Sequence, residues 1–110
     1  MELNAQRWHN LSLAQQIGNI GSEVARAFLW KSRGEIAQTE KAVDRFLELI
    51  DLTLADNRWR KRRLEVTRLR EVLCDYFFGK NNFSLSQQQI DSYFLSFAIL
   101  SSNNVHPAFS

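Results

Sequence analysis

The 110-residue chain has few of the residues that form disulfides or tight turns: one cysteine, one proline and four glycines. A single cysteine excludes an internal disulfide and any metal site built from several cysteines. Scarce proline and glycine leave few turn signals, so a sheet of many short strands is disfavoured. The composition predicts an all-α fold.

Signals for catalysis and for membranes are also scarce. The chain has no glycine-rich phosphate loop, and its only two histidines lie near opposite ends. No apolar run approaches the ~20 residues that cross a bilayer, and the N-terminus lacks the basic-then-apolar order of a signal peptide. We therefore expect a cytoplasmic, non-enzymatic protein without a cofactor, a bound metal or a membrane contact.

Hydrophobic residues make up 45% of the chain and recur mostly at helical spacing. Ser12 and Gln15 form the pattern of a capping box, which predicts a helix over 13–32 that stops before Gly34. Further helices are expected over 35–55 and 58–78, and a shorter one after a second Ser-x-x-Gln start at residue 86. Gly18 and Gly21, inside the first of these helices, suggest a close approach of another helix.

Four helices on short connections predict an antiparallel four-helix bundle with a short fourth helix. No internal repeat, low-complexity tract or linker divides the chain, so residues 1–110 are expected to form one domain. Residues 1–11 are interpreted as a lead-in that Trp8 and Leu11 could anchor, and residues 101–110 as a loosely held tail.

Some leucines and one phenylalanine fall off the main apolar faces of their helices. A helix that is apolar on more than one side is either central in the fold or shared with another subunit. The second alternative predicts a homo-oligomer whose contacts include Leu49, Leu52, Leu64 and Phe78.

Positive charge is concentrated in one stretch. Residues 58–70 hold seven of the fourteen Lys and Arg against one acid, whereas residues 1–57 hold six bases and eight acids. Clustered cations bind phosphates through counterion release, and a tryptophan among them could stack on a base. The predicted nucleic-acid contacts are Arg58, Trp59, Arg60, Lys61, Arg62, Arg63 and Arg68. The alternative is a solvated face neutralised by acids of neighbouring helices.

Carboxylates on several helices offer a different hypothesis, a metal-dependent nucleotide hydrolase. Glu48-x-x-Asp51 is half of the pattern found in all-helical nucleotide pyrophosphohydrolases, but the upstream Glu-x-x-Glu pair is missing. Arginines accompany the acids, which favours ion pairs over metal binding. The candidate ligands under this hypothesis would be Glu23, Glu48, Asp51, Glu71 and Asp75.

Residues 11–20, Leu-Ser-Leu-Ala-Gln-Gln-Ile-Gly-Asn-Ile, precede a leucine-rich helix and a basic helix. Over residues 11–80 this order resembles a group of small bacterial helical bundles. The group comprises the accessory variability determinant proteins of diversity-generating retroelements and the 23S rRNA intervening-sequence proteins. The resemblance implies a pentameric homo-oligomer whose basic surface contacts a reverse transcriptase and structured RNA or DNA, without catalytic residues. The alternative function is a protein–protein adaptor or structural oligomer that binds no nucleic acid.

Overall fold

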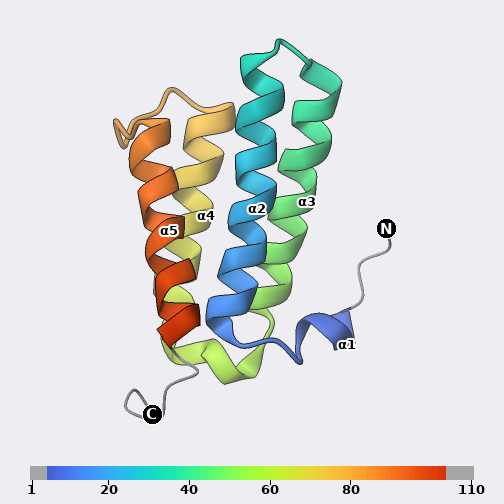
Figure 1. Ribbon diagram of the computed structural model, residues 1–110, viewed down its shortest axis with the longest axis vertical. Coiled ribbons are helices and arrows are strands. Elements are labelled where there is room, and N and C mark those ends of the chain that lie inside the picture. The colour runs from blue at the N-terminus through green and yellow to red at the C-terminus, as the bar shows by residue number, and fades with distance from the viewer. Residues whose placement is uncertain (1–4, 104–110) are drawn as a thin grey trace.

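The computed structural model describes the backbone of residues 5–103 and the side chains of residues 5–96. All regular elements in this part of the chain are helical, which confirms the all-α prediction. The long helices α2 to α5 lie side by side, and a short 3₁₀ helix, η1, joins α3 to α4 at one end (Figure 1). The elements are α1 (Ala5–Trp8), α2 (Leu13–Ser32), α3 (Ile36–Leu54), η1 (Asn57–Arg62), α4 (Arg63–Phe78) and α5 (Gln87–Asn103).

Two of the expected helix lengths are wrong. α5 has 17 residues and α4 has 16, so the last helix is not short. The basic run up to Arg62 forms η1 and not the first turns of α4. Trp59 (φ −105°, ψ 16°) interrupts η1, and Arg62 (φ −107°, ψ 5°) separates it from α4, which begins at Arg63. α5 also includes the first residues of the predicted tail, whereas residues 104–110 lie outside the described residues.

Local sequence signals at the helix ends act as predicted. The Ser12 hydroxyl accepts a hydrogen bond from the Gln15 amide (3.1 Å), and the Gln15 side chain accepts one from the Ser12 amide (2.9 Å). Ser86 and Gln89 repeat both bonds at the start of α5 (3.1 and 2.8 Å). Such caps each stabilise a helix by ~1 kcal/mol. Gly34, at φ 70°, follows α2 in the left-handed conformation that ends a helix.

The two glycines inside α2 differ in role. A Cβ on Gly21 would lie 2.8 Å from Cδ1 of Phe94, so its absence allows α5 to approach α2. The close approach predicted at Gly21 is therefore present. A Cβ on Gly18 would meet nothing within 4 Å, and the same prediction is wrong there.

One hydrophobic core joins the long helices. α2 contributes the apolar stripe that periodicity predicts, and the rings of Phe28, Tyr76, Phe77 and Phe46 connect α2, α4 and α3 at centroid distances of 5.1 to 5.5 Å. Burial of these apolar side chains is the main source of stability. The fully or almost fully buried members include Ile17, Ile20, Val24, Phe28, Val43, Phe46, Ile50, Val66 and Leu73.

The N-terminal segment is docked onto the bundle by Trp8, as expected for an anchor. Its ring is buried, and its indole Nε1 donates to the Thr53 hydroxyl near the end of α3 (3.0 Å). Leu11 also packs against the core. Helix α1 therefore lies at the same end of the molecule as η1 (Figure 1).

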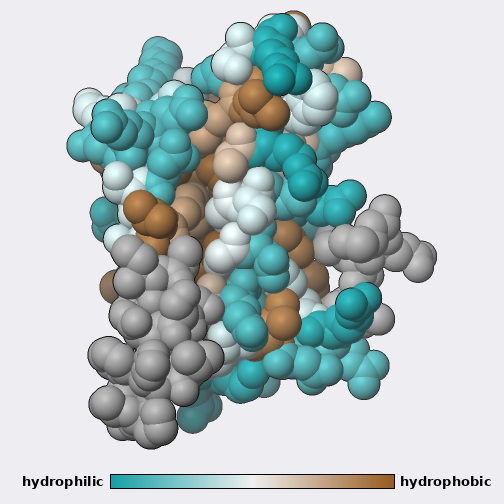
Figure 2. All heavy atoms as spheres, viewed as in Figure 1, coloured by the Kyte–Doolittle hydropathy of each residue, from teal (hydrophilic) through white to brown (hydrophobic). Residues whose placement is uncertain are grey.

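The coloured part of the face seen in Figure 2 is mainly hydrophilic, with hydrophobic residues visible along the seam between α5 and α2. Within the described residues, no helix combines the length and the apolar character that crossing a bilayer requires.

The four residues expected at a subunit contact separate into two groups. Leu49 is 5% exposed and belongs to the core of its own chain, so the prediction that it faces outward is wrong. Leu52 is half-buried and also packs against that core. Leu64 and Phe78, on α4, are 81% and 62% exposed and remain available for a contact.

Candidate nucleic-acid interface at the basic turn

The basic turn, residues 56–65, covers η1 and the residues that flank it. It holds five cations and two carboxylates, a net charge of +3. The turn lies at the end of the molecule where α3 stops and α4 starts, beside α1 (Figure 1). The residues that are coloured along the lower edge of Figure 2, at this end of the molecule, are hydrophilic. The question for function is which of the five cations are neutralised within the chain.

Asp56 and Arg58 form a clamp at the start of the turn. The buried Asp56 carboxylate receives Nη2 of Arg58 at 2.6 Å and Nε at 3.0 and 3.2 Å, and it caps η1 by accepting the Arg58 amide at 3.1 Å. Mainly through these Arg58 side-chain bonds, the pKa of Asp56 falls to about 2. Arg58 Nη2 also donates to the Leu11 carbonyl (2.8 Å). The structure therefore uses Arg58 to hold the turn, which argues against its predicted role as a phosphate contact.

Trp59 also has a structural role in the turn. Its ring packs against the core, its Nε1 donates to Gln16 Oε1 (3.0 Å), and the Arg58 guanidinium lies 4.4 Å from the ring centroid. A ring whose edge is hydrogen-bonded and whose face carries a guanidinium has little surface left for a nucleobase. The base-stacking role predicted for Trp59 is not supported.

Gln16 connects the turn to the N-terminal segment. This side chain is fully buried in α2. Its Nε2 donates to the Trp8 carbonyl (2.8 Å) and, at the longer distance of 3.4 Å, to Asp56. Its oxygen accepts the Trp59 indole proton, so one amide links three segments of the chain. Buried polar groups are stable only when paired in this way.

Arg62 and Arg63 have partners at the exposed surface. Arg62 pairs with Glu65, with Nη2 and Nε at 2.7 and 2.9 Å from Oε2. Arg63 donates to the Leu54 carbonyl at the end of α3 (3.2 Å) and to Asn57 (3.4 Å). A cation at a helix C-terminus is favoured by the helix dipole, but a carbonyl does not neutralise its charge.

Arg60 and Lys61 are different. Both are exposed, and among the described residues neither has a carboxylate within ion-pair distance. Together with the unneutralised Arg63, they account for the +3 of the turn. Internal ion pairs therefore explain Arg58 and Arg62, but leave these three cations without a counter-charge from the described part of the chain.

Arg68 does not join this group. Five residues beyond Arg63, it lies roughly 140° further around α4, at ~100° per residue. Its guanidinium is 5.9 Å from the ring centroid of Phe83, in the loop before α5, and it lines a pocket beside α5. The structure thus separates Arg68 from the basic turn, with which it was predicted to act.

The five carboxylates of the hydrolase hypothesis do not converge. Glu23 pairs with Arg26 (3.1 Å), Asp51 pairs with Arg70 (2.9 Å), and Asp75 accepts the amides of two loop residues. Within residues 5–96, no three His, Cys, Asp or Glu side chains cluster as metal ligands would. The geometry therefore gives the hydrolase hypothesis no support.

Sequence reasoning missed Gln16 and the clamp role of Asp56. Asp56 is followed two residues later by Arg58, and an aspartate before a helical turn is a capping signal, so the clamp was open to prediction. Gln16 carries no such signal, because its partners Trp8 and Trp59 are 8 and 43 residues away.

Comparisons of the chain with protein-family models, with curated proteins and with solved structures find no match. The resemblance to the accessory variability determinant and intervening-sequence proteins therefore stays a prediction.

Proposed function

We propose that this protein is a non-enzymatic helical scaffold, an antiparallel four-helix bundle, that binds nucleic acid through the basic turn. The supporting observation is the pair Arg60 and Lys61, two exposed cations without a carboxylate partner in the described residues. They project from a turn that the Asp56–Arg58 clamp and Trp59 hold in place, so the backbone that carries them needs no further ordering when they meet phosphates.

The mode of binding follows from which groups remain available. Arginine and lysine at the surface contact the phosphate backbone, which gives affinity without reading sequence. Since Trp59 is engaged with Gln16 and Arg58, no aromatic ring of the turn contributes base recognition. We expect weak sequence preference and a strong dependence of affinity on salt.

A salt titration tests the proposal. Affinity for a labelled single-stranded RNA is measured at several salt concentrations for the wild type and for Arg60→Gln/Lys61→Gln. Each lost phosphate contact lowers the slope of log affinity against log salt by ~0.7 for single strands, so the double variant should lose about 1.4.

The matched control is Lys41→Gln/Lys80→Gln, which removes two exposed cations near the opposite end of the molecule, where the loops α2–α3 and α4–α5 lie (Figure 1). Its slope should equal that of the wild type. An unchanged slope in the Arg60/Lys61 variant, or an equal loss in the control, would refute the assignment of the basic turn.

The proposed scaffold is a homo-oligomer, for which the outer face of α4 is the supporting feature. Leu64 and Phe78 are 14 positions apart, close to four full turns, so both lie on the same side of α4. The proposal assigns both side chains to one contact with a neighbouring subunit. In sedimentation velocity, Leu64→Gln/Phe78→Gln should sediment as a smaller species than the wild type. Leu29→Gln/Leu95→Gln, which alters two other exposed leucines, should not.

The resemblance stated above suggests a reverse transcriptase as a protein partner, with this chain as its accessory subunit. A reverse transcriptase encoded beside this chain, and retained by it after nuclease treatment, would support that partner. The second candidate function, a protein–protein adaptor, is favoured by the exposed Ile36 and Phe78, which line a pocket of about 230 Å³. Partner binding unchanged in Arg60→Gln/Lys61→Gln and after nuclease treatment would favour the adaptor.

A further inference from the structure

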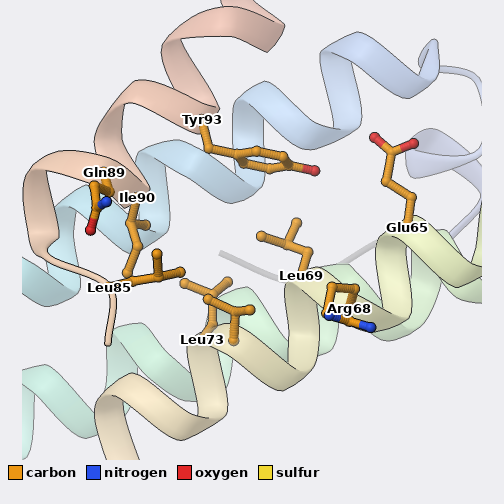
Figure 3. A pocket seen from close by; sticks show the side chains of 9 residues that line it. Glu65, Arg68, Leu69, Leu73, Leu85, Gln89, Ile90 and Tyr93 are labelled. Carbon is orange, nitrogen blue, oxygen red and sulfur yellow. The ribbon is translucent and has the colours of Figure 1, made fainter. Parts of the chain in front are cut away.

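A pocket of about 350 Å³ lies between α4 and α5, and none of the three unpaired cations of the basic turn lines it. Leu69 and Leu73 of α4 form one wall, and Leu85 and Ile90 form the wall opposite (Figure 3). The space exists because α5 packs mainly on α2, where Gly21 admits Phe94, and only sparsely on α4. The volume falls within the ~300–1,000 Å³ that small-molecule sites occupy.

The polar side chains that line this mainly apolar pocket are Glu65, Arg68, Gln89 and Tyr93. Arg68 and Glu65 lie at one end, and the ring of Tyr93 spans the pocket with its hydroxyl directed toward that end (Figure 3). Glu65 is already neutralised by Arg62, at 2.7 Å. Arg68 has no carboxylate within ion-pair distance among the described residues; it lies only beside the Phe83 ring. The rim therefore has a surplus positive charge.

The ring of Tyr93 forms part of the pocket wall. Burial, the largest cause, raises the pKa of Tyr93 to about 12, so the side chain stays neutral at neutral and moderately alkaline pH and adds no negative charge to the rim. A guanidinium on one side of an apolar chamber matches a ligand with an anionic head.

We propose that the α4–α5 pocket binds a free anionic amphiphile with the size of a medium-chain fatty acid. The apolar tail lies between the leucine walls, and the carboxylate lies at the rim near Arg68. Burial of the tail supplies most of the affinity, and the rim cation supplies the preference for an anion over a cation. The pocket shares Glu65 with the basic turn but is lined by none of Arg60, Lys61 and Arg63.

Binding of three probes with the same tail tests the charge preference. Decanoate, decanol and decylammonium are titrated into the full chain by calorimetry, below the micelle-forming concentration of the two ions and below the solubility limit of decanol. Decanoate should saturate one site and bind about fivefold more tightly than decanol, as expected for one partly exposed ionic contact. Decylammonium should bind least.

Two variants test the location. Val72→Phe places a ring in the pocket that Val72 lines and should weaken decanoate and decanol alike, by roughly tenfold or more. Arg68→Gln should remove the preference for decanoate and leave decanol unchanged. Lys41→Gln, an exposed cation on α3, is the matched control and should behave as the wild type.

Several outcomes would overturn the proposal. They are decylammonium binding as tightly as decanoate, an unchanged affinity in folded Val72→Phe, or binding only to phosphatidylglycerol vesicles and not to monomeric decanoate. If circular dichroism shows that Val72→Phe does not fold, the proposal is tested by the affinities of the three probes for the wild type and for Arg68→Gln. It is refuted if Arg68→Gln keeps the preference for decanoate.

Discussion

Replacing Gln16 by leucine tests whether the buried amide network holds the basic turn. Leucine has a similar volume but removes the acceptor for Trp59 Nε1 and the donor to the Trp8 carbonyl. Each buried group left unpaired costs about 1–3 kcal/mol. Because Trp59 is only half-buried, water can accept part of the hydrogen bonding of its indole N–H. We therefore expect a loss of about 3 kcal/mol in the free energy of unfolding. That is a large fraction of the ~5–15 kcal/mol of a typical domain.

Two measurements test the expected effect of Gln16→Leu. Urea unfolding gives the loss in free energy, and hydrogen exchange of the three indole N–H groups, followed by NMR, locates it. In the wild type the Trp8 and Trp59 indoles, which donate to Thr53 and Gln16, should exchange more slowly than the Trp30 indole. Gln16→Leu should accelerate exchange at Trp59 more than at Trp8, because the Trp8 indole keeps its hydroxyl partner.

The control is Gln88→Leu, an exposed glutamine in the first turn of α5, which should change the free energy of unfolding by less than about 0.5 kcal/mol. If Gln16→Leu unfolded at the same urea concentration as the wild type, with unchanged exchange at Trp59, the amide network would not hold the turn.

The remaining predictions concern stability. Because the pKa of Asp56 is lower in the folded chain (about 2) than in the unfolded chain (3.8), its stabilisation of about 2 kcal/mol is complete above pH ~4. It is lost as the pH falls toward 2, and Asp56→Asn should abolish that part of the pH dependence of urea unfolding. Gly21→Ala should lower the melting temperature because its Cβ would press on the Phe94 ring. Gly18→Ala, with open space around it, should raise stability by about 0.5–1 kcal/mol. Ser12→Ala should cost ~1 kcal/mol in urea unfolding, through its lost cap.

Features that depend on neighbours along the chain were predictable. The capping boxes at Ser12 and Ser86, the stop at Gly34 and the apolar stripe of α2 each involve residues a few positions apart. Their geometry follows from the helical repeat and from local hydrogen bonds, whatever the rest of the fold does. The concentration of cations in residues 58–63 is likewise plain in the sequence.

The candidate site was only partly predictable, because the sequence shows which residues are charged but not which of them form ion pairs in the folded chain. Lys61 and Arg62 stand four and three residues before Glu65, both at helical pairing distance, yet Arg62 pairs with Glu65 whereas Lys61 has no carboxylate in reach within the described residues. From the sequence, Trp59 was predicted to stack on a base. In the structure its indole N–H donates to Gln16, which is 43 residues away. A contact between residues so far apart is decided by how the helices pack.

The amino-acid sequence by itself determined that this chain is helical, where most of its helices begin, and that one end would be strongly basic. Only the tertiary structure decided that Leu49 is core while Leu64 is surface, that Arg68 belongs to a pocket, and that Gly21 rather than Gly18 admits α5. The reason is physical. Periodicity and caps act over one or two turns, whereas burial and pairing depend on which helix lies against which face.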